Sequence, residues 1–139
     1  MHPLEQHLTA IAQRFGLSAL YAFGSRAREL AARARGTRLP PGSSDLDIGV
    51  QPLPGRTLSA GDRVRLGTEL ENLLGGPRVD LVVLSAADPF LALNVIQGEL
   101  LYCLDPDAQA EEELYILRRA GDLAPYERER RRLILGLGR

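Results

Sequence analysis

The chain has 139 residues and a formal net charge of −1 at pH 7. This length is typical of one domain with a modest core, and the balanced charge gives no overall field that would attract nucleic acid or a membrane. The sequence contains arginine but no lysine, which excludes Schiff-base chemistry and a phosphate-loop lysine. Cys103 is the only cysteine, which excludes an intramolecular disulfide and a thiolate metal cluster. No apolar run is long enough to span a bilayer and no secretory leader opens the chain, so we expect a cytoplasmic protein.

The N-terminal part predicts a helix, a strand and a second helix. Apolar residues at helical spacing predict a helix over 4–15, and the aliphatic segment 17–23 predicts a strand. Ser25 is expected to cap a helix that runs to about residue 35, because a serine side chain accepts hydrogen bonds from the free N–H groups of a first turn. Proline and glycine predict a loop over 36–44.

The rest of the chain continues this alternation of helices and strands. The predicted elements are a strand at 44–50, a turn at 51–55, a helix at 59–74, a strand at 78–84, a helix at 88–98, a strand at 99–104, and two helical pieces after 105, divided near Gly121 and Pro125. Several connections are too short to force a parallel sheet. The pattern therefore predicts an α+β fold, a mixed β-sheet flanked by α-helices with a C-terminal helical tail.

Two aspartates stand in one predicted strand. Asp45 and Asp47 alternate with aliphatic residues, so both carboxylates are expected on the same face, about 7 Å apart. Two like charges at this distance repel unless a cation lies between them. Because hard divalent cations such as Mg²⁺ prefer oxygen ligands, the pair predicts a metal site.

Two further segments are candidates for the same site. Asp80 is a charged residue inside an otherwise aliphatic strand, and it either completes the metal site or pairs with a neighbouring arginine such as Arg78. Gly24 and Ser25 stand at the predicted junction between a strand and a helix. Such a junction either binds phosphate through free backbone N–H groups or is only an ordinary helix cap. Arg26 supplies a cation to a phosphate or is a solvated helix residue.

These motifs together resemble the minimal nucleotidyltransferases of the DNA polymerase β superfamily. The resemblance covers most of residues 1–105. In this chain, the connection between the glycine–serine turn and the aspartate strand is longer and richer in arginine than in the family. The segments that carry it are Tyr21–Arg28, Ser44–Val50 and Val79–Val82, with Asn94, Ile96, Gly98, Leu100, Leu101 and Tyr102.

The resemblance implies transfer of a nucleotidyl group from an NTP with release of pyrophosphate. It implies that Asp45, Asp47 and Asp80 hold two Mg²⁺ ions, that Gly24, Ser25 and Arg26 bind the triphosphate, and that residues 1–105 form the catalytic core. Residues 106–139 would be a helical tail that packs on the core or on a partner.

The acceptor is the most open part of the interpretation. Because members of this group are often paired with HEPN-domain toxins, the first hypothesis is an antitoxin that moves AMP from ATP to a hydroxyl of a HEPN-domain partner, in a homo- or hetero-oligomer, without nucleic acid or membrane. One alternative is an antitoxin that has lost catalysis and acts by binding. Another is a nucleotidyltransferase for small molecules of the aminoglycoside type, which the short tail disfavours but the acidic run Glu111–Glu113 keeps open.

Overall fold

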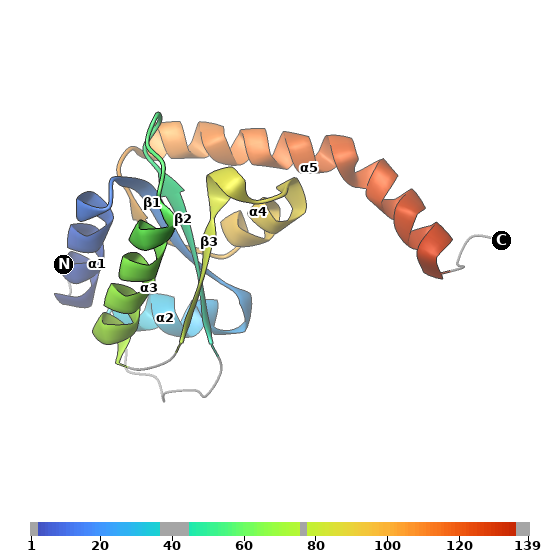
Figure 1. The fold of residues 1–139 in the computed structure, drawn as a ribbon. Coiled ribbons are helices and arrows are strands. Elements are labelled where there is room, and N and C mark those ends of the chain that lie inside the picture. The colour runs from blue at the N-terminus through green and yellow to red at the C-terminus, as the bar shows by residue number, and fades with distance from the viewer. Residues whose placement is uncertain (1–2, 37–44, 76–77, 136–139) are drawn as a thin grey trace.

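A four-stranded mixed sheet forms the centre of the molecule (Figure 1). The computed structural model describes residues 3–36, 45–75 and 78–135. The strand order is β3-β2-β1-β4, with β1 antiparallel to both neighbours and β2 parallel to β3. The strands are β1 Leu17–Phe23, β2 Leu46–Pro52, β3 Val79–Val83 and β4 Glu99–Cys103. The predicted fold class is therefore confirmed.

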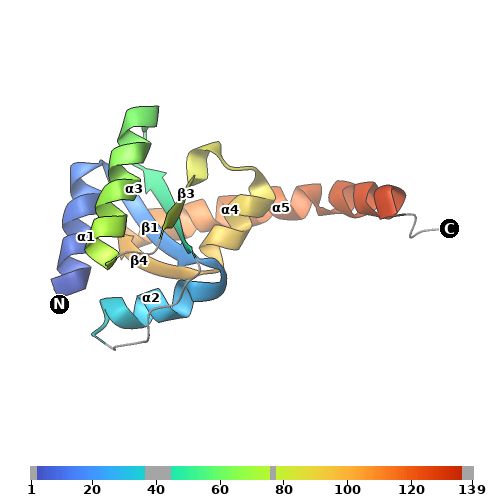
Figure 2. The same cartoon turned by 60° about the horizontal axis from the view of Figure 1, so that its bottom comes forward.

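Three helices and one hydrophobic cluster cover one face of the sheet. The helices are α1 Pro3–Arg14, α2 Ala27–Ala34 and α3 Ala60–Leu74, which Figure 2 shows together on one side. Leu8 of α1 and Leu66 of α3 pack against Leu20, Ile48 and other aliphatic side chains of β1 and β2. Burial of these side chains stabilises this layer by roughly 1.5–3 kcal/mol per large residue.

The other face is covered by α4 Pro89–Ile96 and by the first part of α5 Pro106–Leu135. Val95 of α4 lies so close to the sheet that a side chain on Gly49 would come within 2.3 Å of its Cγ1 atom. Glycine at this position of β2 therefore allows α4 to pack directly on the strand. This face also carries the side chains of Tyr21 and Phe23.

The C-terminal segment is one continuous helix, so the predicted division into two helices is wrong. Pro125 lies inside α5, and Figure 1 shows that the distal part of the helix bends away from the core. A proline inside a helix removes one hydrogen bond, and its ring clashes with the carbonyl group four residues earlier, which bends a helix without always ending it. Ion pairs of Glu127 and Glu129 with arginines three and four residues later add a small stabilisation to the turns beyond it. In the described part of the chain, no helix is long and apolar enough to cross a membrane.

Two further local predictions were wrong. Ser25 does not cap α2: it lies in a 3₁₀ turn, Gly24–Arg26, and the residue at the N-cap position of α2 is Arg26, without a capping side-chain bond. Strand β2 begins after Asp45 and continues to Pro52, because Pro52 still pairs with Leu17 of β1. Of the turn that was expected over 51–55, only residues 53–55 therefore lie outside the strand. The loop predicted over 36–44 lies largely outside the described residues.

Candidate active site

Two of the predicted carboxylates face each other across neighbouring strands. In the parallel pair of β2 and β3, Asp47 stands in register with Asp80. Adjacent strands are about 4.8 Å apart, and residues in register point to the same face of a sheet. Asp47 is partly buried and Asp80 is exposed. The structure therefore brings these two carboxylates to one end of the face that α4 and α5 cover.

The glycine of the predicted phosphate-binding turn lies directly against this pair. Phe23, the last residue of β1, is in register with Asp47, so Gly24 follows immediately beside the aspartate. Gly24 has φ +75°, a backbone conformation that favours glycine, and a Cβ atom there would lie 2.3 Å from Oδ2 of Asp47. Both the backbone and the space available thus require glycine next to this carboxylate.

Electrostatic repulsion is concentrated on Asp47. Its pKa is raised above the usual range, first by burial and then by the charges of Asp80 and Asp45. Asp45 stands immediately before β2 and is exposed, yet it is close enough to contribute. Within the described residues, none of the three carboxylates has an ion pair with an arginine. Among the described residues the three carboxylates thus form a negative cluster without a paired cation, and the predicted alternative that Asp80 pairs with Arg78 is not seen there.

The donor set suits a hard divalent cation, although it is not a closed protein cage. In the described ranges, no group of three or more histidine, cysteine or acidic side chains is arranged so that it could enclose a metal ion. Mg²⁺ does not need such a cage, because it is usually held by one or two carboxylates together with substrate phosphates and water. Asp47 and Asp80 can provide these carboxylates, with Asp45 at the margin.

Ser25 and Arg26 differ in their availability to a ligand. Ser25 is exposed in the 3₁₀ turn beside Gly24. Arg26 is buried, and its guanidinium donates two hydrogen bonds to the carboxylate of Glu29, at 2.9 and 2.7 Å. These bonds hold the pKa of Glu29 below its usual range. The phosphate contact predicted for Arg26 stays a prediction.

Glu29 is a residue that the sequence interpretation missed. Its spacing of three residues from Arg26 within a helical segment was a usable signal, because side chains at i and i+3 are neighbours on a helix. The ion pair fixes the start of α2 directly behind the glycine–serine turn. Glu29 is therefore a positioning residue for this end of the site.

A polar cluster fixes α5 to the opposite end of the same sheet face. The hydroxyl of the buried Tyr21 donates to Glu113 at 2.5 Å, and Gln109 donates to the Tyr21 oxygen at 2.8 Å. Gln109 also donates to Gln51 of β2 at 3.0 Å. The pKa of Tyr21 is raised by burial and by its bond to Glu113. The cluster ties α5 to β1, which leads into Gly24, and to β2, which contains Asp47.

Comparison with known proteins agrees with this geometry. The family model of polymerase β nucleotidyltransferases ("Polymerase beta, Nucleotidyltransferase") matches residues 6–107, which contain all the candidate site residues. The chain belongs to this family. The match confirms the resemblance that the three sequence segments predicted. A search of curated proteins found no significant match to this nucleotidyltransferase.

Solved structures show the same fold over nearly the whole chain. A toxin–antitoxin structure with AMP-PNP has a TM-score of 0.65 at 24% identity, covering 96% of this chain and 97% of the other. The structure of a tri-AMPylated HEPN toxin from Shewanella oneidensis in complex with its MNT antitoxin has a TM-score of 0.64 at 23% identity, with coverages of 96% and 95%. A toxin–antitoxin MntA–HepT structure has a TM-score of 0.63 at 23% identity and covers 96% of each chain. At these identities the likeness establishes the fold.

Proposed function

We propose that this chain is a Mg²⁺-dependent nucleotidyltransferase that moves AMP from ATP to a hydroxyl group of a HEPN-domain partner, as the antitoxin of a toxin–antitoxin pair. The observation that carries the proposal is the register of Asp47 with Asp80, with Gly24 closed against Asp47. The similar structures support the choice of nucleotide and partner, because one contains AMP-PNP and another an AMPylated HEPN toxin. The cytoplasmic location stays a prediction.

Each residue has a role that follows from its position. Asp47 and Asp80, with Asp45, would hold the two Mg²⁺ ions, which when bound neutralise the phosphate charges and the charge that develops on the leaving pyrophosphate. Gly24 lets the backbone approach the triphosphate closely, and the Ser25 hydroxyl donates to a phosphate oxygen. Asp80, the exposed member of the pair, would accept the proton of the acceptor hydroxyl while the hydroxyl oxygen bonds to the α-phosphorus and the bond from that phosphorus to pyrophosphate breaks.

The same geometry favours catalysis over a purely binding antitoxin. Like charges directly opposite each other on neighbouring strands destabilise a sheet. A module that acts by contact alone has no use for this pair at a partly buried position. The cluster is best explained as a site whose repulsion is relieved when metal and nucleotide bind.

The proposal is tested with ATP labelled at the α-phosphate. The chain is incubated with Mg²⁺, this ATP and the HEPN-domain protein encoded beside it, and the label on the partner is quantified. We expect labelling by wild type, loss by at least about a hundredfold in Asp47→Asn, and no change in Asp122→Asn, which alters an exposed carboxylate of α5. No transfer from any NTP, or equal transfer by Asp47→Asn, would refute the proposal.

A further inference from the structure

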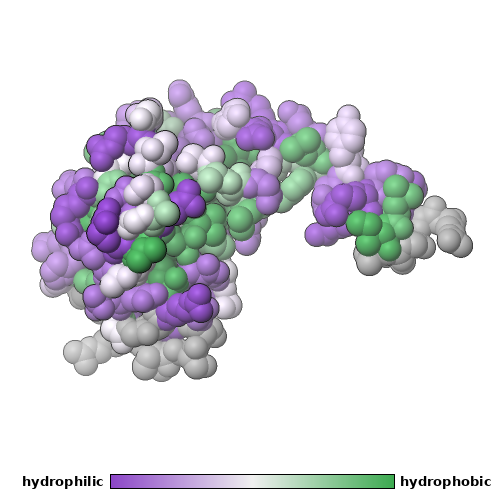
Figure 3. Space-filling view, viewed as in Figure 1, coloured by the Kyte–Doolittle hydropathy of each residue, from purple (hydrophilic) through white to green (hydrophobic). Residues whose placement is uncertain are grey.

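The distal part of α5 forms an arm that extends beyond the core. Gln109 and Ile116 are buried on the sheet face and Ala120 is also buried, whereas the distal part of the helix projects away from the core (Figure 1). Large side chains on this arm are exposed: Tyr126 by 75% and Leu133 by 71%. Figure 3 shows apolar and hydrophilic side chains side by side on the arm.

A cleft of about 650 Å³ opens where the arm passes the start of α4. Pro89 and Phe90 form its apolar side on α4, and Ala124 contributes from α5. This volume is in the range of cavities that hold a ligand or a few side chains of a partner. The cleft therefore offers an apolar contact that is open to another molecule.

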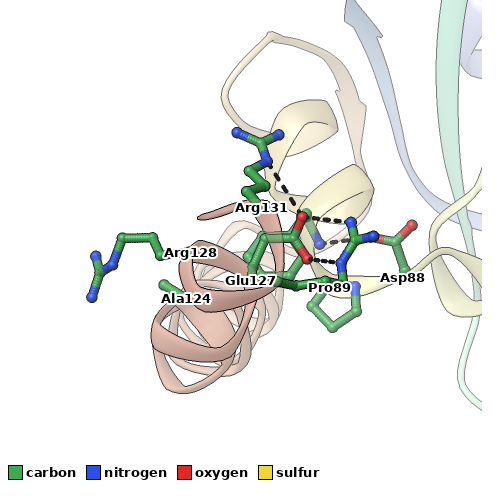
Figure 4. A pocket seen from close by; sticks show the side chains of 8 residues that line it. Asp88, Pro89, Ala124, Glu127, Arg128 and Arg131 are labelled. Atoms are coloured by element: carbon green, nitrogen blue, oxygen red, sulfur yellow. Dashed lines mark hydrogen bonds and ion pairs between the residues drawn. The ribbon is translucent and has the colours of Figure 1, made fainter. Parts of the chain in front are cut away.

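The arm side of the cleft has an excess of positive charge. Arg128, Arg130 and Arg131 line it together with a single carboxylate of the arm, Glu127. Glu127 accepts from Arg130 at 2.8 Å and lies 3.4 Å from Arg131, and this arrangement lowers the pKa of Glu127. Figure 4 shows Arg128 pointing away from Glu127. Glu127 thus pairs with two of the three arginines, and among the described residues Arg128 has no ion pair.

The other carboxylate of the cleft, Asp88, keeps its negative charge, so three arginines face two carboxylates and one positive charge remains in excess. Asp88 caps α4, where its Oδ1 atom accepts from the backbone N–H groups of Phe90 and Leu91 at 2.9 and 3.0 Å. A capping carboxylate stays with its helix, because leaving it would uncover these N–H groups. An apolar floor beside an arginine wall is complementary to an acidic segment with apolar side chains.

The cleft also lies within reach of the proposed active site. Strand β3 leads away from Asp80 to Val83, a span of about 10 Å, and the 3₁₀ turn Leu84–Ala86 then connects it to the start of α4. A protein interface of standard size covers about 800 Å² per partner, a patch roughly 30 Å across. One bound protein can therefore occupy the cleft and present a hydroxyl to the carboxylates.

We infer that the cleft between α4 and the arm of α5 docks an acidic, partly apolar segment of the protein that accepts the nucleotidyl group. This inference rests on the proposed function. Binding here fixes the acceptor relative to Asp47 and Asp80 before transfer. The arginines steer the acidic segment, and the side chains of Pro89 and Phe90 bury its apolar residues.

The test measures binding without catalysis. In an Asp47→Asn background, affinity for the HEPN-domain protein is measured by calorimetry, with Arg128→Glu as the test variant. Arg118→Glu is the matched control, because it makes the same charge change at an exposed position of the same helix outside the cleft. We expect Arg128→Glu to weaken binding about tenfold and Arg118→Glu by less than twofold.

Crosslinking then locates the contact. A photoreactive p-benzoylphenylalanine at position 90 should crosslink to a partner segment rich in Asp and Glu, whereas the same group in place of the exposed Val64 of α3 should not. Equal affinity of the two arginine variants, or no crosslink from position 90, would overturn the inference. A loss by Arg128→Glu of binding to single-stranded RNA with unchanged binding to the protein would also overturn it, in favour of a nucleic-acid surface. Because catalysis is absent throughout, these failures are distinct from failure of the labelling experiment.

Discussion

Replacing Asp47 by asparagine should stabilise the fold while it removes the proposed activity. The substitution keeps the size of the side chain and removes the negative charge that faces Asp80 and lies near Asp45. Like charges directly opposite on neighbouring strands cost roughly 0.2–1 kcal/mol. We therefore expect the free energy of unfolding of Asp47→Asn at pH 7 to exceed that of wild type by this amount, or by about 1–4 °C in Tm.

The pH dependence has a defined sign. Because the pKa of Asp47 is raised in the folded state, this state binds its proton more tightly than the unfolded chain does. Wild type loses stability relative to Asp47→Asn as the pH rises from about 3.9, the usual pKa of an aspartate in an unfolded chain, through the raised pKa of Asp47 in the folded state. Above that pH the difference in stability is constant. The advantage of the variant should therefore disappear in acid.

Urea unfolding at pH 7 and at pH 3.5 measures this difference, and Asp122→Asn is the control that should behave as wild type. Magnesium should reverse the order at pH 7, because a ligand at ten times its Kd stabilises the protein that binds it by about 1.4 kcal/mol. A variant that is less stable than wild type at pH 7 without metal would refute the repulsion between Asp47 and its neighbours.

Three further outcomes are expected. Gly24→Ala should lower transfer of the label at least about tenfold, whereas Gly55→Ala, which has a similar φ of +79° but open space around it, should lower only stability, by roughly 1–2 kcal/mol. Tyr21→Phe should lower the free energy of unfolding in urea by about 2 kcal/mol through loss of its bonds to α5, and Tyr102→Phe, on the half-buried strand β4, by less than about 0.5 kcal/mol. Gly67→Ala should raise stability by up to about 1 kcal/mol, because nothing obstructs a methyl group at this position of α3; a measured loss would contradict the helix geometry.

Local sequence patterns were sufficient to predict most of the elements. The strand Leu17–Phe23 has the predicted bounds, and α3 begins directly after Ser59 and ends at Leu74, close to the predicted helix over 59–74. Asp88 followed by Pro89 likewise marked the start of α4. These signals act within one turn or strand, so they can be recognised without knowledge of the fold.

The features that could not be predicted from the sequence depend on contacts between segments that lie far apart in the chain. The register that places Asp47 opposite Asp80 arises from parallel pairing of two strands separated by α3. The bond of Tyr21 to Glu113 joins β1 to α5, and no local pattern announces it. The error over Pro125 has a different origin, because an internal proline can bend a helix as well as end it, and α5 continues through Pro125.

The most direct test of the central claim is manganese binding, measured by electron paramagnetic resonance with an ATP analogue that cannot transfer its nucleotidyl group. Mn²⁺ replaces Mg²⁺ at oxygen sites and its free signal disappears on binding. The wild-type chain should bind Mn²⁺ together with the nucleotide, Asp47→Asn should weaken this by at least about tenfold, and Asp122→Asn should not change it. Equal binding of Mn²⁺ and nucleotide by wild type and Asp47→Asn would contradict the assignment of the site to Gly24, Asp47 and Asp80.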